Sequence, residues 1–408
     1  MRILMPVYRG APADGFYFEF LRGISEALIE LGHKPIGFPF TSPEKPTQQE
    51  AFALCRLVSQ EQVDVVLDLA AWGYSLSRIK VSGTSAGSAP IFAATGIPYV
   101  ALLLDHPQFQ ALDGICATSL YAAYPDLDHP AQARMIYPAL AARIDLISPP
   151  GVRRAWDCSA PQGCAGREMD VLYVGNLHPG PLARFWNDRG SVGWRESIHA
   201  EFCDALTDLV IENPERAFHA SALSACEALR IDPVGFDFAS QFRAVELHLR
   251  FRYRRDAVVA LAGSGVSLTV IGDGWEQLNL PANARVHPPV AYQEFLQLMG
   301  RAKVHLDAST YLQGANDRIF AAAINRTVSF TNAAGYLSAD GEAVPWRFYS
   351  MQHLSELGDR LRDLLERPHA LSQYGEQARD LALSHHTWRH RIENILGRLS
   401  TSDEGGRR

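Results

Sequence analysis

Short apolar runs alternate along this chain with longer segments in which apolar residues recur at helical spacing. Every fourth residue from Phe16 to Leu28 is apolar, which predicts a helix over 16–31. A second helix is predicted over 52–63, and the segment 81–96, rich in Gly, Ser and Ala, predicts a loop with a short helix. The apolar runs of this first half predict strands at 2–8, 35–40, 64–69, 99–104 and 145–148.

The second half of the chain repeats this alternation. A long, mainly helical insert is predicted over 194–262, and a pair of helices over 351–399 ends the pattern. The stretch 149–167 is interrupted by Pro and Gly and predicts a linker between two domains. The apolar runs of this half predict strands at 170–176, 267–272, 285–287, 303–307 and 328–331.

Alternating strands and helices are typical of α/β proteins with a mostly parallel sheet and helices on both faces. We therefore predict two Rossmann-like domains, 1–165 and 166–375, with the insert inside the second, followed by a terminal segment 376–408. Ligands of such sheets bind outside the carboxyl ends of the strands, so the residues that follow each strand are the candidates for function.

Composition and charge narrow the functional classes. The chain has 408 residues, 47% of them hydrophobic and 20% charged, as in soluble globular proteins. Its net charge of -7 argues against general affinity for nucleic acid or an anionic membrane. No apolar run approaches the roughly 20 residues that span a bilayer, and the first residues enter a strand directly, which leaves no room for a signal peptide. The six cysteines lack framework spacing, so we expect a reduced, cytoplasmic protein; the alternative is a disulfide between Cys158 and Cys164, which lie in one loop.

Several enzyme classes are disfavoured by the motifs that the sequence lacks. No Gly-x-Gly-x-x-Gly follows the first strand, no phosphate-loop Lys-Ser/Thr pattern occurs, and no Gly-x-Ser-x-Gly elbow occurs. His and Cys have no metal-ligand spacing, so neither a bound metal nor a resident cofactor is expected.

The most informative segment is 313–320, a polar, Gly-containing loop that opens the Ala-rich helix expected from Asp317 to Ile324. The first N–H groups of a helix are unpaired and its dipole is positive there, which suits a phosphate group. Arg318 adds a bidentate cation in the first turn. The alternative is a surface arginine near a helix start with no ligand.

Four segments with glycine, aromatic or basic residues lie at the carboxyl ends of the predicted strands 170–176, 267–272, 285–287 and 303–307. Together they predict a site for a nucleotide diphosphate. Glycines there let backbone N–H groups approach an anion, Trp275 and Tyr292 are candidates to pack on a base, and Val290 and Ala291 offer backbone groups to a base edge. The predicted donor-binding residues are Gly175, Asn176, Gly272, Gly274, Trp275, Val290, Ala291, Tyr292, Asn316, Asp317 and Arg318. The basic run 247–255 is interpreted instead as a mainly solvated helix face.

Catalytic candidates in the first half also follow strands. Asp14 is a candidate base or, equally, the N-cap of the helix at Phe16. Asp105 and His106 end a very apolar strand and are candidates to deprotonate an acceptor or to hold a leaving diphosphate, although a structural hydrogen bond explains His106 as well. Asp68 and Trp72 are weaker candidates to line an acceptor pocket.

The segments 270–275, 290–295, 301–306, 314–320 and 386–391 carry a family resemblance in their order and spacing. From about residue 170 to 399 the chain resembles the C-terminal domain of GT-B-fold glycosyltransferases, in particular the spore-maturation-protein-like, "glycosyl transferases group 1" type. The resemblance implies that 166–375 binds a nucleotide-sugar donor and 1–165 binds the acceptor. It also implies that 376–408 crosses back onto the first domain, with His385 and His386 in packing roles.

The chain departs from this family at two positions. Many relatives have Glu where this chain has Ala321, and that Glu is expected to bind the donor ribose. Relatives also commonly have Gly where this chain has Asn325-Arg326.

The resemblance implies a metal-independent glycosyltransferase that moves a sugar from a nucleotide-diphosphate sugar to an acceptor glycan, lipid, peptide or protein. Arg318 would neutralise the leaving diphosphate. An inverting reaction would use Asp14, Asp105 or His106 as base, and a retaining one would use them only to orient the acceptor. Two alternatives stay open, an inactive nucleotide-sugar-binding protein and a nucleotide-sugar epimerase on the same fold.

Overall fold

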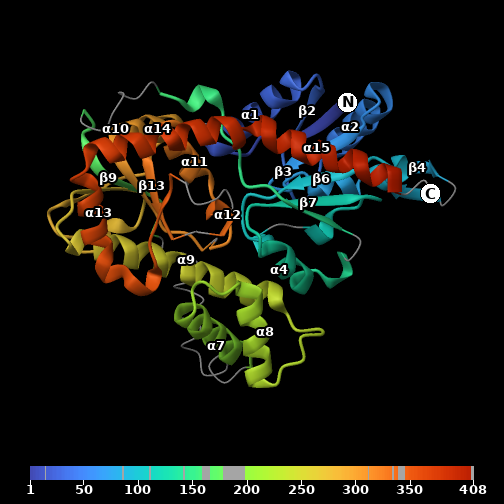
Figure 1. The fold of residues 1–408 in the computed structure, drawn as a ribbon. Coiled ribbons are helices and arrows are strands. Elements are labelled where there is room, and N and C mark those ends of the chain that lie inside the picture. The colour runs from blue at the N-terminus through green and yellow to red at the C-terminus, as the bar shows by residue number, and fades with distance from the viewer. Residues whose placement is uncertain are drawn as a thin grey trace. The chain divides into compact units, whose positions relative to one another are not determined.

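The chain folds into two compact units, each built around its own parallel sheet (Figure 1). The computed structural model describes residues 1–13, 15–84, 87–109, 112–140, 143–158, 166–177, 198–310, 312–332, 335–338 and 345–405. Unit 1 comprises Met1–Gly151 together with Thr387–Arg408, and unit 2 comprises Val152–His386. No described helix is long and apolar enough to cross a membrane.

Unit 1 contains a six-stranded sheet in the order β2-β1-β3-β6-β7-β8, with all neighbours parallel. Every residue of the adjacent strands β3, β6 and β7 is buried, as expected of a parallel sheet that is covered on both faces. The strands are β1 (Arg2–Tyr8), β2 (Lys34–Phe40), β3 (Val65–Leu69), β6 (Tyr99–Leu102), β7 (Leu120–Tyr124) and β8 (Ile144–Ile147).

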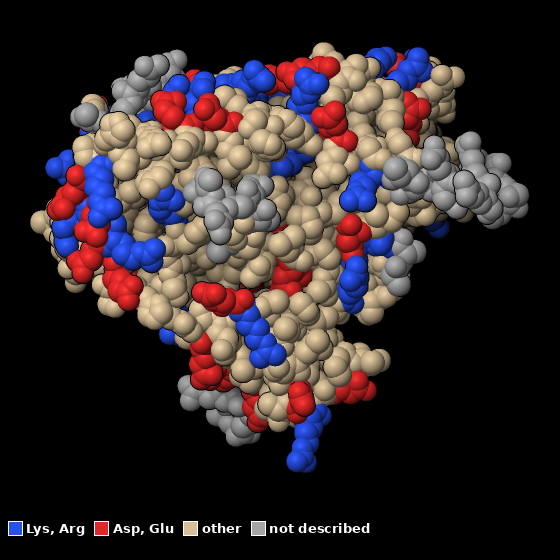
Figure 2. All heavy atoms as spheres, viewed as in Figure 1, with Lys and Arg blue, Asp and Glu red and all other residues tan. Residues whose placement is uncertain are grey.

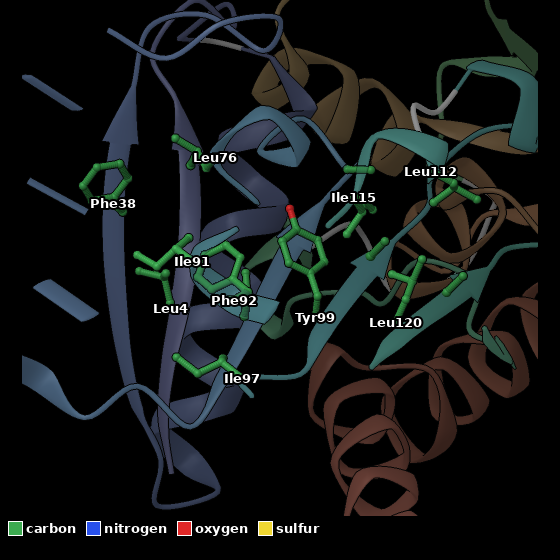
Figure 3. Close-up of a cluster of buried hydrophobic side chains, with 14 of the residues drawn as sticks. Leu4, Phe38, Leu76, Ile91, Phe92, Ile97, Tyr99, Leu112, Ile115 and Leu120 are labelled. Carbon is green, nitrogen blue, oxygen red and sulfur yellow. The ribbon is translucent and has the colours of Figure 1, made fainter. Parts of the chain in front are cut away.

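The core of unit 1 lies between this sheet and its helices (Figure 3). Aliphatic and aromatic side chains from β1, β2, β6 and β7 pack there, among them Leu4, Phe38 and Tyr99. Burial of such side chains is the main stabilising contribution to the fold. The helices of the unit are α1 (Phe16–Glu30), α2 (Gln48–Glu61), α3 (Ile91–Thr95), α4 (His129–Ile136) and α15 (Trp388–Gly405).

The last helix, α15, belongs to unit 1 although most of unit 2 precedes it in the chain. Trp388 packs its ring on Phe20 of α1 at 5.4 Å, and Arg391 donates to the Pro149 carbonyl at 2.9 Å. Figure 1 shows α15 alongside α1. The predicted return of the chain to its first domain is therefore confirmed.

Two elements of unit 1 differ from the prediction. The segment predicted as a loop with a short helix contains a β-hairpin, β4 (Lys80–Thr84) and β5 (Gly87–Pro90), before α3. Strand β7 was not predicted, because its sequence, Leu-Tyr-Ala-Ala-Tyr, has few β-branched residues. Its position inside the sheet, between β6 and β8, overrides that weak propensity.

Unit 2 contains a second six-stranded parallel sheet, in the order β11-β10-β9-β12-β13-β14. The short edge strand β14 was not predicted, and the other five lie where the apolar runs placed them. The strands are β9 (Met169–Val174), β10 (Leu268–Ile271), β11 (Ala284–His287), β12 (Ala302–Asp307), β13 (Val328–Thr331) and β14 (Arg347–Phe348).

The helical insert of unit 2 ends in a long helix, α9, that passes over the sheet and against α13. Helices α7 and α8 pack on each other, and α7 also packs on α9 (Figure 1). The described helices of the unit are α7 (Ile198–Glu212), α8 (Phe218–Leu229), α9 (Phe238–Gly263), α10 (Tyr292–Arg301), α11 (Asp317–Ile324), α12 (Gly335–Ser338), α13 (Leu357–Leu365) and α14 (Pro368–His385).

Candidate functional site

The candidate site of unit 2 lies at the carboxyl end of β9, the strand from which the sheet grows in both directions. Strand β9 pairs with β10 on one side and with β12 on the other. At such a point of a parallel sheet, the connections that leave two neighbouring strands run to opposite faces of the sheet. This opens a crevice between the two strand ends, and ligands of parallel sheets bind in it. The residues at this point are Val174, Gly175 and Asn176.

Two glycines allow the ends of β9 and β10 to approach closely. Gly272 has φ +143°, a region that is essentially open to glycine alone, and a Cβ there would lie 2.4 Å from the Gly175 oxygen. The Asn176 side chain accepts from the Asp273 N–H at 3.0 Å, which holds the two turns together. Gly175, Gly272 and Asn176 are therefore held close together at the ends of β9 and β10.

Trp275 supports this turn from beneath. Its ring is fully buried and packs on Tyr173, and its Nε1 donates to the Gly175 carbonyl at 2.7 Å. A buried indole N–H needs such a partner, and here the partner is the turn itself. Trp275 therefore acts on the site through Gly175, since its ring has no accessible face to stack on a base.

Helix α11 begins at the predicted residue, but its first N–H groups are not all unpaired. Asn316 is the N-cap, and its side-chain oxygen accepts from the N–H groups of Arg318 (3.0 Å) and Ile319 (3.3 Å). Its amide donates in turn to Asp307 at 2.8 Å, and Thr331 donates to the other oxygen of that carboxylate. The expectation of free N–H groups is thus wrong for two of them, because an N-cap side chain already satisfies them.

Arg318 turns from the start of α11 toward the end of β9. Its Nη1 donates to the Val174 carbonyl at 2.8 Å and lies so near Gly175 that a Cβ there would come within 3.3 Å of it. Burial lowers the pKa of Arg318, but the carboxylates of Asp307 and Asp317 outweigh it and the net shift is upward. Its buried Nε has no hydrogen-bond partner among the described residues. The guanidinium is therefore charged, positioned and incompletely bonded.

A second arginine, Arg254 of α9, reaches the same strand end from another direction. Its Nη1 donates to the Asn176 carbonyl at 3.0 Å, and its Nε is buried without a partner in the described part of the chain. Burial lowers the pKa of Arg254, and the nearby charges of Arg318 and Arg250 lower it further, while Tyr173 and Glu246 act in the opposite direction. The interpretation of this run as a mainly solvated helix face missed Arg254. The spacing along a helix cannot tell which arginine faces a distant strand.

Arg250 lies one helical turn before Arg254 and is held by an acid. It pairs with the buried carboxylate of Glu246 at 2.7 Å, and Thr310, which follows β12, donates to that carboxylate at 2.7 Å. The helix is thus tied to the loop that precedes α11. By contrast, no ion pair within 4.0 Å joins Arg254 to a described acid.

The remaining predicted residues line the start of α10. Val290, Ala291 and Tyr292 are half-buried, and Ala291 is the N-cap. The Tyr292 hydroxyl donates to Asp317 at 3.3 Å, and its ring contacts Trp156 edge-on at 5.5 Å. Burial raises the pKa of Asp317, while Arg318 and the Tyr292 hydroxyl act in the opposite direction.

The two departures from the family pattern have clear structural settings. Ala321 is fully buried, and its carbonyl accepts from Asn325, whose side-chain amide also donates to the Trp156 carbonyl. Arg326 has φ +57°, the left-handed conformation that favours glycine, and its guanidinium pairs with Glu376 at 2.8 Å. The position therefore keeps the backbone shape of a glycine while an ion pair helps to hold the arginine.

His386 has the packing environment that the resemblance implies. It is buried, and its ring stacks on Phe320 of α11 at 4.6 Å with an interplanar angle of 28°.

The catalytic candidates of unit 1 are only partly described. Asp14 lies outside the described residues. Asp105 is half-buried and accepts from the His106 N–H at 2.9 Å. His106 is buried, and its ring meets that of His129, at the start of α4, with centroids 5.0 Å apart. Sequence reasoning missed His129, because only the fold brings it beside His106. The roles of Asp105 and His106 stay predictions.

Comparison with known proteins agrees with this architecture. Residues 252–397 match the family model described as glycosyl transferase-like. A search of curated proteins gives no match. Among solved structures, the chain is similar to an alpha-glucosyltransferase in complex with UDP and mismatch-containing DNA, with TM-score 0.55 and 10% identity over 98% of this chain and 100% of that one.

Two further structures extend the similarity over nearly the whole chain. Sucrose-phosphate synthase from Thermosynechococcus elongatus has TM-score 0.54 and 10% identity over 100% of both chains. Anabaena HepE in complex with UDP and glucose has TM-score 0.53 and 13% identity over 98% of this chain and 99% of that one. The chain therefore has the GT-B fold, and its residues 252–397 are similar to the glycosyl transferase-like family model.

Proposed function

We propose that this protein is a glycosyltransferase that uses a nucleotide-diphosphate sugar as donor. One observation carries the proposal: Arg254 and Arg318 come from different helices and donate to carbonyls only two residues apart at the end of β9. Two guanidiniums in so small a region repel each other, and a bound anion offsets that electrostatic repulsion. A diphosphate has the charge and the acceptor oxygens to engage both.

The family match and the neighbouring structures support the rest of the donor. Two of the similar structures contain UDP, so uridine diphosphate is the first nucleotide to test. The half-buried Tyr292 and the backbone of Val290 and Ala291 lie at the adjoining end of β11 and are proposed to contact the nucleoside. Trp275 is proposed to keep the turn in shape beneath the phosphates.

In the proposed reaction, the bond between the anomeric carbon and the diphosphate oxygen breaks as the acceptor hydroxyl bonds to that carbon. The two arginines stabilise the negative charge that develops on the leaving diphosphate. The hydroxyl proton passes to a base in an inverting reaction, for which Asp105 and His106 are the described candidates, or to the departing diphosphate in a retaining one.

Because two guanidiniums supply positive charge at this point, we propose that the reaction needs no metal ion. Activity that persists in EDTA would agree with this, and activity restored only by a divalent cation would contradict it. Five described cysteines form no disulfide, which supports a cytoplasmic location. Charges of both signs are interspersed on the face shown in Figure 2, and with the net charge of -7 they support an acceptor other than nucleic acid.

The experiment is a thermal-shift panel of nucleoside diphosphates and their sugars. A ligand that binds only the folded protein at a hundred times its Kd stabilises it by about 2.7 kcal/mol, which is readily detected. We expect one nucleotide class to give the largest shift, and its sugar to be consumed when an acceptor is supplied. No shift with any nucleotide would refute the proposal. Binding without transfer or hydrolysis would favour an inactive binding protein, and isomerised sugar would favour an epimerase.

A further inference from the structure

Unit 1 has a switch point of its own, between β1 and β3, where the sheet grows in both directions. Strand β1 ends at Tyr8, and a turn over 70–73 follows β3. By the rule that locates the unit 2 site, this is where a ligand of unit 1 is expected.

The turn after β3 is strained and yet firmly held. Ala70 and Ala71 both have left-handed backbones, with φ of 59° and 51°, at a cost of about 1–2 kcal/mol each. The fully buried carboxylate of Asp68 accepts from the Gly73 N–H at 2.9 Å and from the Tyr99 hydroxyl at 2.6 Å. Burial raises the pKa of Asp68 to about 7, a further cost. Strain and buried acids that persist in a fold are concentrated at functional sites.

This turn fixes the position of one large side chain, Trp72. Its ring stacks on Tyr17 with centroids 4.5 Å apart and meets Tyr8 edge-on at 5.3 Å. Tyr17 is itself locked, because its hydroxyl donates to the Pro6 carbonyl and accepts from the Tyr8 N–H. The aromatic shelf formed by Tyr8, Tyr17 and Trp72 is therefore rigid.

Two polar groups of the shelf remain available for hydrogen bonds to a ligand. Tyr8 and Trp72 are both half-buried, and neither the Tyr8 hydroxyl nor the Trp72 Nε1 hydrogen-bonds any described residue. The carboxylate that holds the turn, Asp68, is fully buried. The shelf thus offers aromatic surface and two uncharged polar groups.

We propose that this shelf binds a neutral sugar ring of the acceptor. The apolar C–H face of a pyranose packs on the indole, and its hydroxyls bond to the Trp72 Nε1 and the Tyr8 hydroxyl. Uncharged aromatic groups with polar edges suit such a ring better than a phosphate, which needs cations. The inference rests on the proposed function, because it identifies the acceptor as a carbohydrate.

The test is saturation-transfer NMR and calorimetry with methyl glycosides of common neutral hexoses and with neutral disaccharides. The variants are Trp72→Ala, Trp72→Phe and Tyr8→Phe, and the control is Phe52→Ala, which removes an aromatic side chain that is 68% exposed on α2. We expect at least one sugar to bind the wild type and the Phe52 variant equally. Trp72→Ala should weaken that binding about tenfold or more, equivalent to about 1.4 kcal/mol. Trp72→Phe and Tyr8→Phe, which keep the fold and remove one polar group each, should weaken it less.

Two results would overturn the inference: no sugar of the panel binds the wild type, or the sugar binds folded Trp72→Ala and Tyr8→Phe as well as the wild type. Titration of UDP into the same samples separates this outcome from failure of the proposed function. If UDP binds normally and the variants keep the sugar affinity of the wild type, only the proposal for the shelf is refuted. If the protein binds no nucleotide but binds a sugar in a way that depends on Trp72, the proposed donor is refuted and the proposal for the shelf is supported.

Discussion

His305, on the central strand β12 beneath the candidate donor site, is expected to make the protein sensitive to acid. The residue is fully buried, and neither ring nitrogen has a hydrogen-bond partner among the described residues. Burial lowers the pKa of His305 to about 4, with Asp307 acting against the shift and Arg318 adding to it. The folded protein therefore keeps this imidazole neutral at pH values where an unfolded chain protonates it.

The size of the effect follows from the difference between the two pKa values. The unfolded reference is 6.5 and the folded value is about 4. As the pH falls through 6.5, the unfolded chain gains a proton that the folded chain does not take up, so stability is lost. At pH 5 the loss is about 2 kcal/mol, and below pH 4 it levels off at about 3 kcal/mol. At pH 7.5 the contribution is close to zero.

The perturbation is His305→Leu, which keeps a similar volume and removes the titratable group. Urea unfolding of wild type and variant at pH 7.5 and pH 5.0 gives the free energy of unfolding that the substitution gains at each pH. We expect the gain from the substitution to be about 2 kcal/mol larger at pH 5.0. His369→Leu, which changes an exposed histidine on α14, is the matched control. An equal effect of His305→Leu at the two pH values would refute the reasoning.

Three further outcomes are expected from the site in unit 2 and from the packing of α15 within unit 1. Arg254→Met should weaken nucleoside diphosphate binding by about 1.5–3 kcal/mol in calorimetry, as for the loss of a charged hydrogen bond, and Arg255→Met on the exposed face should not. Gly272→Ala should cost about 1–3 kcal/mol in thermal unfolding, because its Cβ would lie 2.4 Å from the Gly175 oxygen, and an unchanged melting temperature would contradict this. Gly151→Ala should also lower the melting temperature, since its Cβ would lie 2.6 Å from the Trp388 nitrogen at the start of α15.

The sequence was most informative where local chemistry decides the structure. The bounds of α11 were predicted correctly, because Asn316 is a strong N-cap and an apolar Ala-rich face follows it. The strand ends at Gly175 and Gly272 were also predicted, since glycine marks a close backbone approach. Strand β7 was missed, because its place in the sheet depends on neighbours that are distant in sequence.

The site itself was only partly predictable, for the same reason. Arg318 was predicted near this strand end from its place in a loop that opens a helix, and its guanidinium does bond to Val174 there. Arg254 was not, because whether a helical arginine faces solvent or a strand end depends on how α9 lies on the sheet. Trp275 was expected to face a base, but its indole N–H is bonded to Gly175 and its ring is buried. A sequence pattern gives the residue type at a strand end but not the direction in which its side chain points.

The proposed function depends above all on the guanidinium of Arg318, which is proposed to bind the diphosphate of a nucleotide-sugar donor at the end of β9. Calorimetric titration of UDP and other nucleoside diphosphates into wild type, Arg318→Ala and the surface control Arg255→Ala tests it most directly. We expect one diphosphate to bind the wild type and the control, and its affinity to fall at least tenfold in Arg318→Ala with the fold intact. Equal affinity of Arg318→Ala and the wild type would contradict it.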